Sequence, residues 1–329
     1  MLFPLYCFRA TRVTAFTSHR ILSFSRSKMA HAGEKHKRSN SDEVDNIYDD
    51  PDHNLYHPTP KRGKEIDQNR PYDELETLLE KNKSGHQPRN VLHWFRFKDI
   101  RQEDNKALHA ASKKAKEGSG SLITMYLHSP KDIETHGTSP ARLDFILDSF
   151  RILQEQLSEK NIPLAMVEVS TRKDKADKVM KFVKDNNVSH IYANMEYEVD
   201  ELRRDINIAK QVQEQKDLSF ELLHDETVVT PGALTTGSGG PIQVFTPYHK
   251  AWLPETKKNK SLLETAPPPE ANDYKASQEF EHLFESSIPE IPESKRFASQ
   301  EERDRLRKLW PAGNEAGMKR LEHFLNNKV

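Results

Sequence analysis

Short apolar runs alternate with amphipathic segments between residues 91 and 223, and this alternation limits the fold more than any other feature of the sequence. Each run is bounded by polar or turn residues. The runs are VLHWF (91–95), LITMYLH (122–128), PLAMVEV (163–169), VSHIYAN (188–194) and LSFELL (218–223). Runs of this length without a polar face predict strands that are covered on both sides of a sheet.

The segments between several of these runs predict helices. In 140–160 apolar side chains recur at three- and four-residue steps and form one continuous face; they are Leu143, Ile146, Phe150, Leu153 and Leu157. The pattern recurs in 172–187 and 198–214. Strand–helix–strand repeats pair in parallel. Residues 89–228 are therefore predicted to form a doubly wound, three-layer α/β/α domain with a five-stranded parallel sheet.

Ligands of doubly wound sheets bind beyond the carboxyl ends of the strands. The segments 96–104, 129–139 and 195–205, each directly after a predicted strand, are therefore the first candidates for a site. The sequence has no Walker loop, no GxGxxG after a strand and no HExxH. A dehydrogenase, a kinase or a hydrolase consequently has no motif in its favour.

Composition narrows the class of protein further. Of the 329 residues, 35% are hydrophobic and 31% are charged, which predicts one compact domain flanked by polar segments. The net charge of −1 gives no electrostatic argument for nucleic-acid binding by the whole chain. No apolar run approaches the ~18–20 residues that cross a bilayer. The single cysteine, Cys7, excludes a disulfide or a Cys-rich zinc site, and we expect neither a membrane nor a metal partner.

The N-terminal region predicts targeting. Residues 1–28 contain five basic residues and no Asp or Glu, as in a mitochondrial presequence, although Met29 is an alternative start. Residues 29–88 are polar and expected to be disordered, apart from a short helix at 71–82. Their basic clusters KHKR (35–38) and PKRGK (60–64) suit nuclear import, or are simply solvated charge.

The C-terminal region predicts a connector followed by a new helix. Residues 229–300 are rich in Pro, Glu, Lys and Ser and are expected to form an extended connector. Residues 301–329 are interpreted as the first helix of a further domain that this sequence does not contain. Its apolar residues Leu321, Phe324 and Leu325 would need a partner to cover them.

Four longer segments carry more specific information. They are WFRFKDIRQEDNKAL (94–108), THGTSPARLDF (135–145), NMEYEVDELRRD (194–205) and VVTPGALTTGSGGPIQVFTPYHKAW (228–252). Each alone has an ordinary structural explanation. In this order and at strand ends, they resemble the photolyase/cryptochrome family, whose first motif is close to WFRxDLRxxDNxAL. Ile100 stands where Leu is usual, and WPAGNEAGMKRLEHFL (310–325) resembles the opening of the family's flavin domain.

The resemblance implies a light-harvesting role for the α/β domain. In this family that domain carries an antenna pigment, often methenyltetrahydrofolate. His136, Asp200 and Glu201 match folate-contacting positions, with Glu201 expected to accept two hydrogen bonds from the pterin. Asp200 stands where bacterial members commonly have Asn, so its contact is less certain to be preserved. Tyr248 matches a residue near the flavin and is a weaker candidate for contact with FAD.

The resemblance also implies an activity for the full-length protein. It would be a monomeric, folate-type class I deoxyribodipyrimidine photo-lyase that binds damaged DNA and FAD through its helical domain. Because that domain is absent from the sequence, we expect this chain not to repair DNA alone. One alternative is a cryptochrome, a blue-light photoreceptor without repair activity, and another is a free pigment- or nucleotide-binding α/β protein. Targeting to both the nucleus and the mitochondrion favours repair, since both contain DNA.

Overall fold

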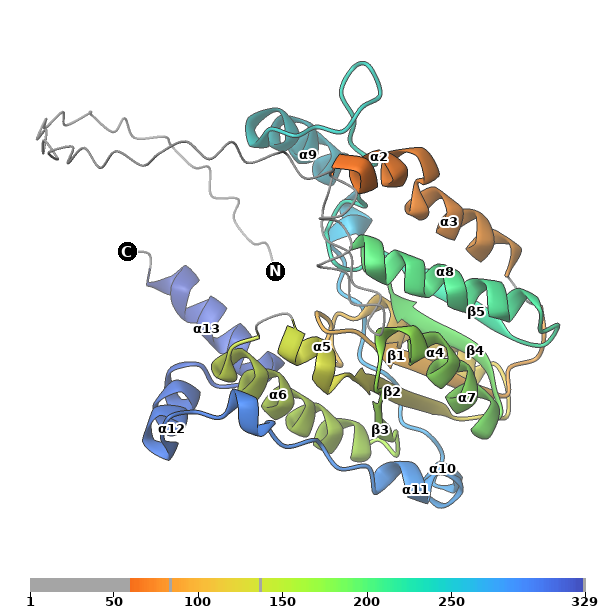
Figure 1. Ribbon diagram of the computed structural model, residues 1–329, viewed down its shortest axis with the longest axis vertical. Coiled ribbons are helices and arrows are strands. Elements are labelled where there is room, and N and C mark those ends of the chain that lie inside the picture. Colours follow the sequence, from red (N-terminus) through yellow and green to blue (C-terminus); the bar gives the residue numbers. More distant parts are fainter. Residues whose placement is uncertain (1–59, 83–84, 136–137, 328–329) are drawn as a thin grey trace, which may run out of the picture. The chain divides into compact units, whose positions relative to one another are not determined.

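A five-stranded parallel sheet forms the centre of the computed structural model, which describes residues 60–82, 85–135 and 138–327 (Figure 1). Its strands are β1 (Asn90–Phe95), β2 (Leu122–His128), β3 (Leu164–Glu168), β4 (Val188–Asn194) and β5 (Ser219–Leu223). They lie in the order β3-β2-β1-β4-β5, with every neighbouring pair parallel. The predicted strands and the predicted sheet are confirmed.

Helices cover both faces of the sheet and make three layers. On one face, α4 (Lys106–Lys116) and α6 (Pro140–Ser158) pack on Val91 and Phe95 of β1. On the other, α7 (Lys175–Asp185) and α8 (Val199–Gln213) pack on Leu92 and Trp94 of the same strand. Alternate residues of β1 thus serve opposite cores, which is why apolar residues occur on both faces of the strand. The predicted α/β/α architecture is confirmed.

The order of the strands reverses at β1. This strand pairs with β2 on one side and with β4 on the other, so the chain builds the sheet outward from β1 in both directions. Loops that leave β1 and β4 at this point diverge to opposite faces and leave a crevice beyond the strand ends. The fold therefore places the segments after β1, β2 and β4 at one edge of the sheet.

Two helices precede the sheet where the polar composition predicts mainly disorder. α2 (Pro60–Asn69) lies within the segment expected to be disordered, so that expectation is wrong for these residues. α3 (Pro71–Lys81) agrees with the helix predicted at 71–82 and packs along α8. Its Leu75 is completely buried in the core beside α8. The presequence-like residues 1–28 and the tail up to residue 59 lie outside the described residues.

The connector is more helical than its composition suggests. It contains α9 (Phe245–Lys258), α10 (Lys275–Glu279) and α11 (Glu281–Phe284), together with short 3₁₀ turns at Lys260–Leu263 and Glu293–Lys295. Phe280 and Leu283 are buried in the core, so this part of the connector belongs to the α/β domain. α9 buries only Thr256 among its described side chains.

The C-terminal stretch forms two helices rather than the one expected. α12 (Gln300–Leu309) ends before Pro311, and α13 (Asn314–Asn326) begins after Gly313, whose φ of 90° suits glycine. On α13, Leu321, Phe324 and Leu325 are 48%, 71% and 54% exposed, as the sequence predicts for a helix without a covering partner. Within the described residues no helix is both long and apolar enough to cross a bilayer.

A buried carboxylate fastens α12 to the α/β domain. Asp144 of α6 accepts two hydrogen bonds from Arg303, at 3.0 and 2.7 Å, and two from Arg307, at 2.7 and 2.8 Å. Burial favours the neutral acid, but the two guanidinium groups outweigh it and hold the pKa of Asp144 below its ordinary value. α12 is therefore tied to the sheet domain by charge-assisted hydrogen bonds.

Truncation of Leu75 tests whether α3 is part of the folded unit. We expect Leu75→Ala to lower the free energy of unfolding by about 2–5 kcal/mol, because a fully buried leucine leaves a cavity. Leu78→Ala, the same change at a half-buried position of the same helix, should cost clearly less. Urea unfolding followed by circular dichroism measures both. Equal, small losses would show that α3 contributes little to the stability of the domain.

His93 is a buried polar group without a hydrogen bond. It is fully buried in β1, and neither ring nitrogen has a partner among the described residues. Its ring meets Phe95 edge-on, with centroids 4.4 Å apart. Burial, assisted by the charge of Arg96, lowers the pKa of His93 to about 3. The folded protein therefore holds this imidazole neutral across the pH range in which the unfolded chain protonates it.

This arrangement predicts a pH-dependent gain from His93→Leu. Below pH 6.5 the unfolded native chain binds a proton that the folded chain rejects, so native stability falls as the pH falls toward 3. Relative to the native chain, the free energy of unfolding of His93→Leu should rise by about 2 kcal/mol when the pH is lowered from 7 to 5. Chemical unfolding at the two pH values measures this difference. His282→Leu, on the exposed surface where water solvates the ring, should show little change; an equal effect there would contradict the assignment.

Candidate functional site

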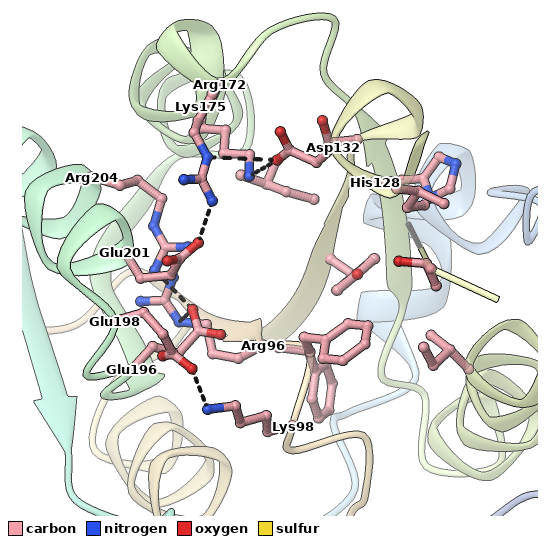
Figure 2. Close-up of a pocket in the computed structure, with 18 of the residues that line it drawn as sticks. Arg96, Lys98, His128, Asp132, Arg172, Lys175, Glu196, Glu198, Glu201 and Arg204 are labelled. Carbon is pink, nitrogen blue, oxygen red and sulfur yellow. Dashed lines mark hydrogen bonds and ion pairs between the residues drawn. The ribbon is translucent and has the colours of Figure 1, made fainter. Parts of the chain in front are cut away.

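A pocket of about 520 Å³ lies beyond the carboxyl ends of β1, β2 and β4, at the edge where the strand order reverses. One side of the pocket is apolar, formed mainly by Phe97, Tyr126, Leu143, Ile146 and Leu147. The opposite side is a band of charged side chains that runs from Lys98 through Glu198, Glu201 and Arg172 to Asp132 (Figure 2). A flat apolar wall facing hydrogen-bonding groups suits a planar heteroaromatic ligand.

The innermost charges form a buried ion network around Asp205. The Nη2 of Arg96 lies 3.0 Å from Oδ2 of Asp205, and the Nε of Arg204 lies 2.9 Å from its Oδ1. Arg204 also pairs with Glu196 at 3.0 Å. Burial opposes the charge of Arg204, but Asp205 and Glu196 outweigh it and raise its pKa. Burial and the charge of Arg204 lower the pKa of Arg96, against the opposing effect of Asp205 and Glu196. The network fixes α8 against the end of β1.

The indole of Trp94 contacts both guanidinium groups of this network. The Cζ of Arg96 is 3.7 Å from the centroid of the indole, and that of Arg204 is 4.8 Å away. Both distances are within the range of a cation–π interaction, which is strongest when water is excluded. Trp94 is 2% exposed and lines the pocket, so the two arginines set the orientation of one of its walls.

Hydrogen bonds at the ends of β1 and β4 account for the Asp and the Asn of the motif that follows β1. Asp99 accepts the backbone N–H of Arg96 at 2.6 Å and the side-chain amide of Asn194 at 2.7 Å. Asn105 caps α4 by accepting the N–H of Leu108 at 3.0 Å. Burial raises the pKa of Asp99 to about 7, against the opposing effect of these donors. The Asp and Asn of the motif thus join β1, β4 and α4.

A second network forms the rim of the pocket. The Nη1 of Arg172 is 2.8 Å from Oδ2 of Asp200, and its Nη2 is 2.7 Å from Oε1 of Glu201. The Nε of Arg172 lies 3.9 Å from Oδ2 of Asp132, which also pairs with the buried Lys175. The rim therefore joins the segments that follow β2, β3 and β4.

The four site residues predicted from the sequence differ in where the structure places them. Asp200 and Glu201 both line the pocket, in the first turn of α8. His136 lies outside the described residues. Tyr248 is on α9 and is not among the residues of this pocket. Contact of any of the four with a ligand stays a prediction.

Sequence reasoning missed the basic half of the rim. Arg172 and Lys175 follow β3, a strand whose end was not among the segments singled out. Applying the strand-end rule to 169–175 as well would have included both residues. Asp132 lies inside the segment 129–139 but has no motif to distinguish it. Among the described residues no group of three or more His, Cys, Asp or Glu side chains is arranged to hold a metal ion.

Comparisons with known proteins agree with this fold. The family model for DNA photolyase matches residues 91–271. The chain belongs to the DNA photolyase family. Within this family it is 40% identical over 242 residues to a deoxyribodipyrimidine photo-lyase of Neurospora crassa, a match that covers 73% of this chain and 39% of that protein. The predicted membership of the photolyase/cryptochrome family is confirmed.

Two further relatives extend the comparison. The mitochondrial deoxyribodipyrimidine photo-lyase of Saccharomyces cerevisiae is 32% identical over 282 residues, covering 79% of this chain and 47% of that protein. The crystal structure of a class III photolyase from Agrobacterium tumefaciens matches the fold with a TM-score of 0.50 at 18% identity. That match covers 74% of this chain and 46% of the other. The chain thus spans less than half the length of these photolyase relatives.

Asp205 gives a direct test of the inner network. We expect Asp205→Asn to lower the free energy of unfolding by about 3–5 kcal/mol, because the change leaves the buried guanidinium of Arg96 without its closest carboxylate. Asp185→Asn, which disrupts an exposed pair with Lys181, should cost less than about 1 kcal/mol. Chemical unfolding of both variants provides the measurement. A loss at Asp205 no larger than at Asp185 would show that the network does not stabilise this corner.

Proposed function

We propose that this chain is the antenna-binding α/β portion of a deoxyribodipyrimidine photo-lyase, and that its pocket holds a light-harvesting pigment. The observation that carries the proposal is the pocket itself, which is lined both by apolar side chains such as Tyr126 and Leu143 and by the carboxylates of Asp200 and Glu201. The names of the Neurospora and yeast relatives support light-dependent repair rather than signalling alone as the activity of the full-length protein.

The pigment that fits this chemistry best is methenyltetrahydrofolate. Its pterin carries a 2-amino group and presents donors on one edge, and a carboxylate accepts two parallel hydrogen bonds from such an edge. Glu201 is the proposed acceptor, and Asp200 lies beside it in the first turn of α8. Tyr126 would cover a face of the ring, and His136 is a further candidate contact. When bound, the pigment absorbs near-ultraviolet light and transfers the excitation energy.

The residues of the chain would act by binding and orientation. The paired charges of the rim hold the carboxylates toward the pocket, and the apolar wall excludes water from the ring. Ser129 also lines the site, and its buried Oγ has no hydrogen-bond partner among the described residues. None of these groups needs to act as a base or a nucleophile.

The remaining functions are proposed for the full-length protein. FAD would be the acceptor of the excitation energy and, once reduced and excited, the electron donor to a cyclobutane pyrimidine dimer in damaged DNA. Tyr248 is a candidate contact for this flavin, because α9 leaves most of its surface open. The residues of this chain supply no flavin site of their own in this proposal, so we expect it not to repair DNA alone. The protein would be monomeric.

Localisation to the mitochondrion and the nucleus belongs to the same proposal. The name of the yeast relative, a mitochondrial photo-lyase, supports the first address. The basic cluster Pro60–Lys64 supports the second, because α2 presents it in an exposed helix. Both compartments contain DNA that ultraviolet light damages.

Substitution of Glu201 tests the proposed site. We expect Glu201→Gln to weaken binding of methenyltetrahydrofolate by about tenfold or more, because the amide replaces one of two acceptor oxygens with a donor. Glu214→Gln, an exposed change of the same chemistry at the other end of α8, should leave the affinity unchanged. Titration of the full chain, followed by the absorption and fluorescence of the pigment, measures both. Binding that is indifferent to Glu201 would exclude this carboxylate from the site.

A further inference from the structure

Arg172 is more than a structural ion pair in the rim of the pocket. Its side chain is 10% exposed, yet it uses only one oxygen of Asp200 and one oxygen of Glu201. The other carboxylate oxygens accept no side-chain hydrogen bond within the described part of the chain. The two side chains are 27% and 19% exposed, so these acceptors remain accessible from the pocket.

The guanidinium also retains a donor of its own. The Nε of Arg172 is buried and makes no hydrogen bond to any described residue; Oδ2 of Asp132, at 3.9 Å, is beyond hydrogen-bond distance. The Oγ of Ser129, in a residue that is 6% exposed, is buried without a partner in the same way. Native proteins rarely leave buried donors unpaired, because the desolvation of such a group is not compensated. Both residues line the pocket, although these two atoms themselves are covered by the protein.

Donor and acceptor therefore lie side by side along the rim. Glu201 offers acceptor oxygens, and Arg172, whose Nη2 is 2.7 Å from one of them, offers N–H groups next to it. The edge of a 2-amino-4-oxopyrimidine presents two donors followed by an acceptor. A 2,4-dioxopyrimidine edge, as in a flavin, presents an acceptor, a donor and an acceptor. A carboxylate followed by a guanidinium complements the 2-amino-4-oxo edge, because the carboxylate accepts from its two donors and the guanidinium donates to its 4-oxo group. On the 2,4-dioxo edge, the same carboxylate would meet and repel the 2-oxo group.

We propose that Arg172 determines the specificity of the pocket: it fixes the carboxylate of Glu201 and adds a donor beside it, so that the site selects a 2-amino-4-oxopyrimidine ring over a 2,4-dioxo ring. This inference rests on the proposed pigment-binding function. Arg172 acts partly through Glu201 and is to that extent a positioning residue. Asp132 on α5 (Pro130–Thr135) lies 3.9 Å from the Nε of Arg172 and also pairs with Lys175 (Figure 2).

Arginine suits this role better than lysine would. Its planar fork reaches Asp200 and Glu201 at once, and it separates two like charges on adjacent residues of α8. A lysine ammonium is a point charge that can neutralise the pair but cannot hold both carboxylates in one plane. Holding these rotamers before the ligand arrives removes part of the entropy cost of binding.

The experiment compares two pteridine rings that carry different groups at position 2. Pterin carries a 2-amino group and lumazine a 2-oxo group, and each is titrated as a competitor of methenyltetrahydrofolate bound to the full chain. The native chain should prefer pterin by about tenfold to a hundredfold. In Arg172→Gln we expect affinity for methenyltetrahydrofolate to fall by about tenfold or more and the preference to shrink to within about threefold. A purely structural loss would weaken both competitors equally and preserve the preference.

Two variants control for charge and folding. Lys173→Gln removes one positive charge from the same 3₁₀ turn, Arg172–Asp174, at an exposed position and should retain native affinity and preference. Arg172→Lys retains the charge, and its thermal unfolding curve should stay close to that of the native chain. Its preference for pterin over lumazine should be smaller than native. This variant tests the role of Arg172 if Arg172→Gln does not fold. An unchanged preference in a folded Arg172 variant overturns the role of Arg172 alone. A native chain that binds no methenyltetrahydrofolate overturns the pigment site itself.

Discussion

The buried guanidinium of Arg96 is the constraint on which the site depends. It lies at the end of β1, donates to the carbonyl oxygen of Asn194 at the end of β4, and pairs with Asp205 of α8. A charge buried this deeply destabilises the fold unless it is paired and hydrogen-bonded, so the two strand ends and the helix must keep their relative positions. Because Asp200 and Glu201 lie one turn earlier on α8, their place at the rim follows from the placement of Asp205. The inner network therefore orients groups that it does not touch.

The layers of the fold could be predicted because burial leaves a strong local pattern. All five strands are apolar runs covered on both faces, and each was located within a residue of its observed ends. α6 and α8 carry long apolar stripes and were located almost as well. α4 was not predicted, because its buried face is built mainly from Ala107, Ala111 and Ala115, and small side chains give a weak periodicity. α2 was missed for a related reason: its polar sequence has no apolar face.

The site could be predicted only in part, for a different physical reason. Asp200 and Glu201 follow a strand and resemble a family motif, so position and identity both indicated them. Arg172 has neither advantage. Its role becomes visible only through ion pairs with residues 28 and 29 positions later in the chain, and such pairing leaves no periodic signal in the sequence. The unpaired buried donors at Arg172 and Ser129 are likewise properties of the folded protein, since exposure to water satisfies both groups in an extended chain.

The balance of charge in the pocket narrows the class of ligand that suits the proposed site. Six of its lining residues are cationic and five are acidic, and five of the six cations are already held by a carboxylate. The sixth, Arg142, has its guanidinium 4.6 Å from the ring centroid of Phe97. Beyond Arg142, a phosphate in this space would have to break existing ion pairs to gain another cation, with little net benefit. A neutral ring that bonds to the remaining lone pairs and N–H groups would leave every pair intact. In the proposed site, this compensation of charge therefore favours a ligand that is recognised by its hydrogen-bonding edge over an anion.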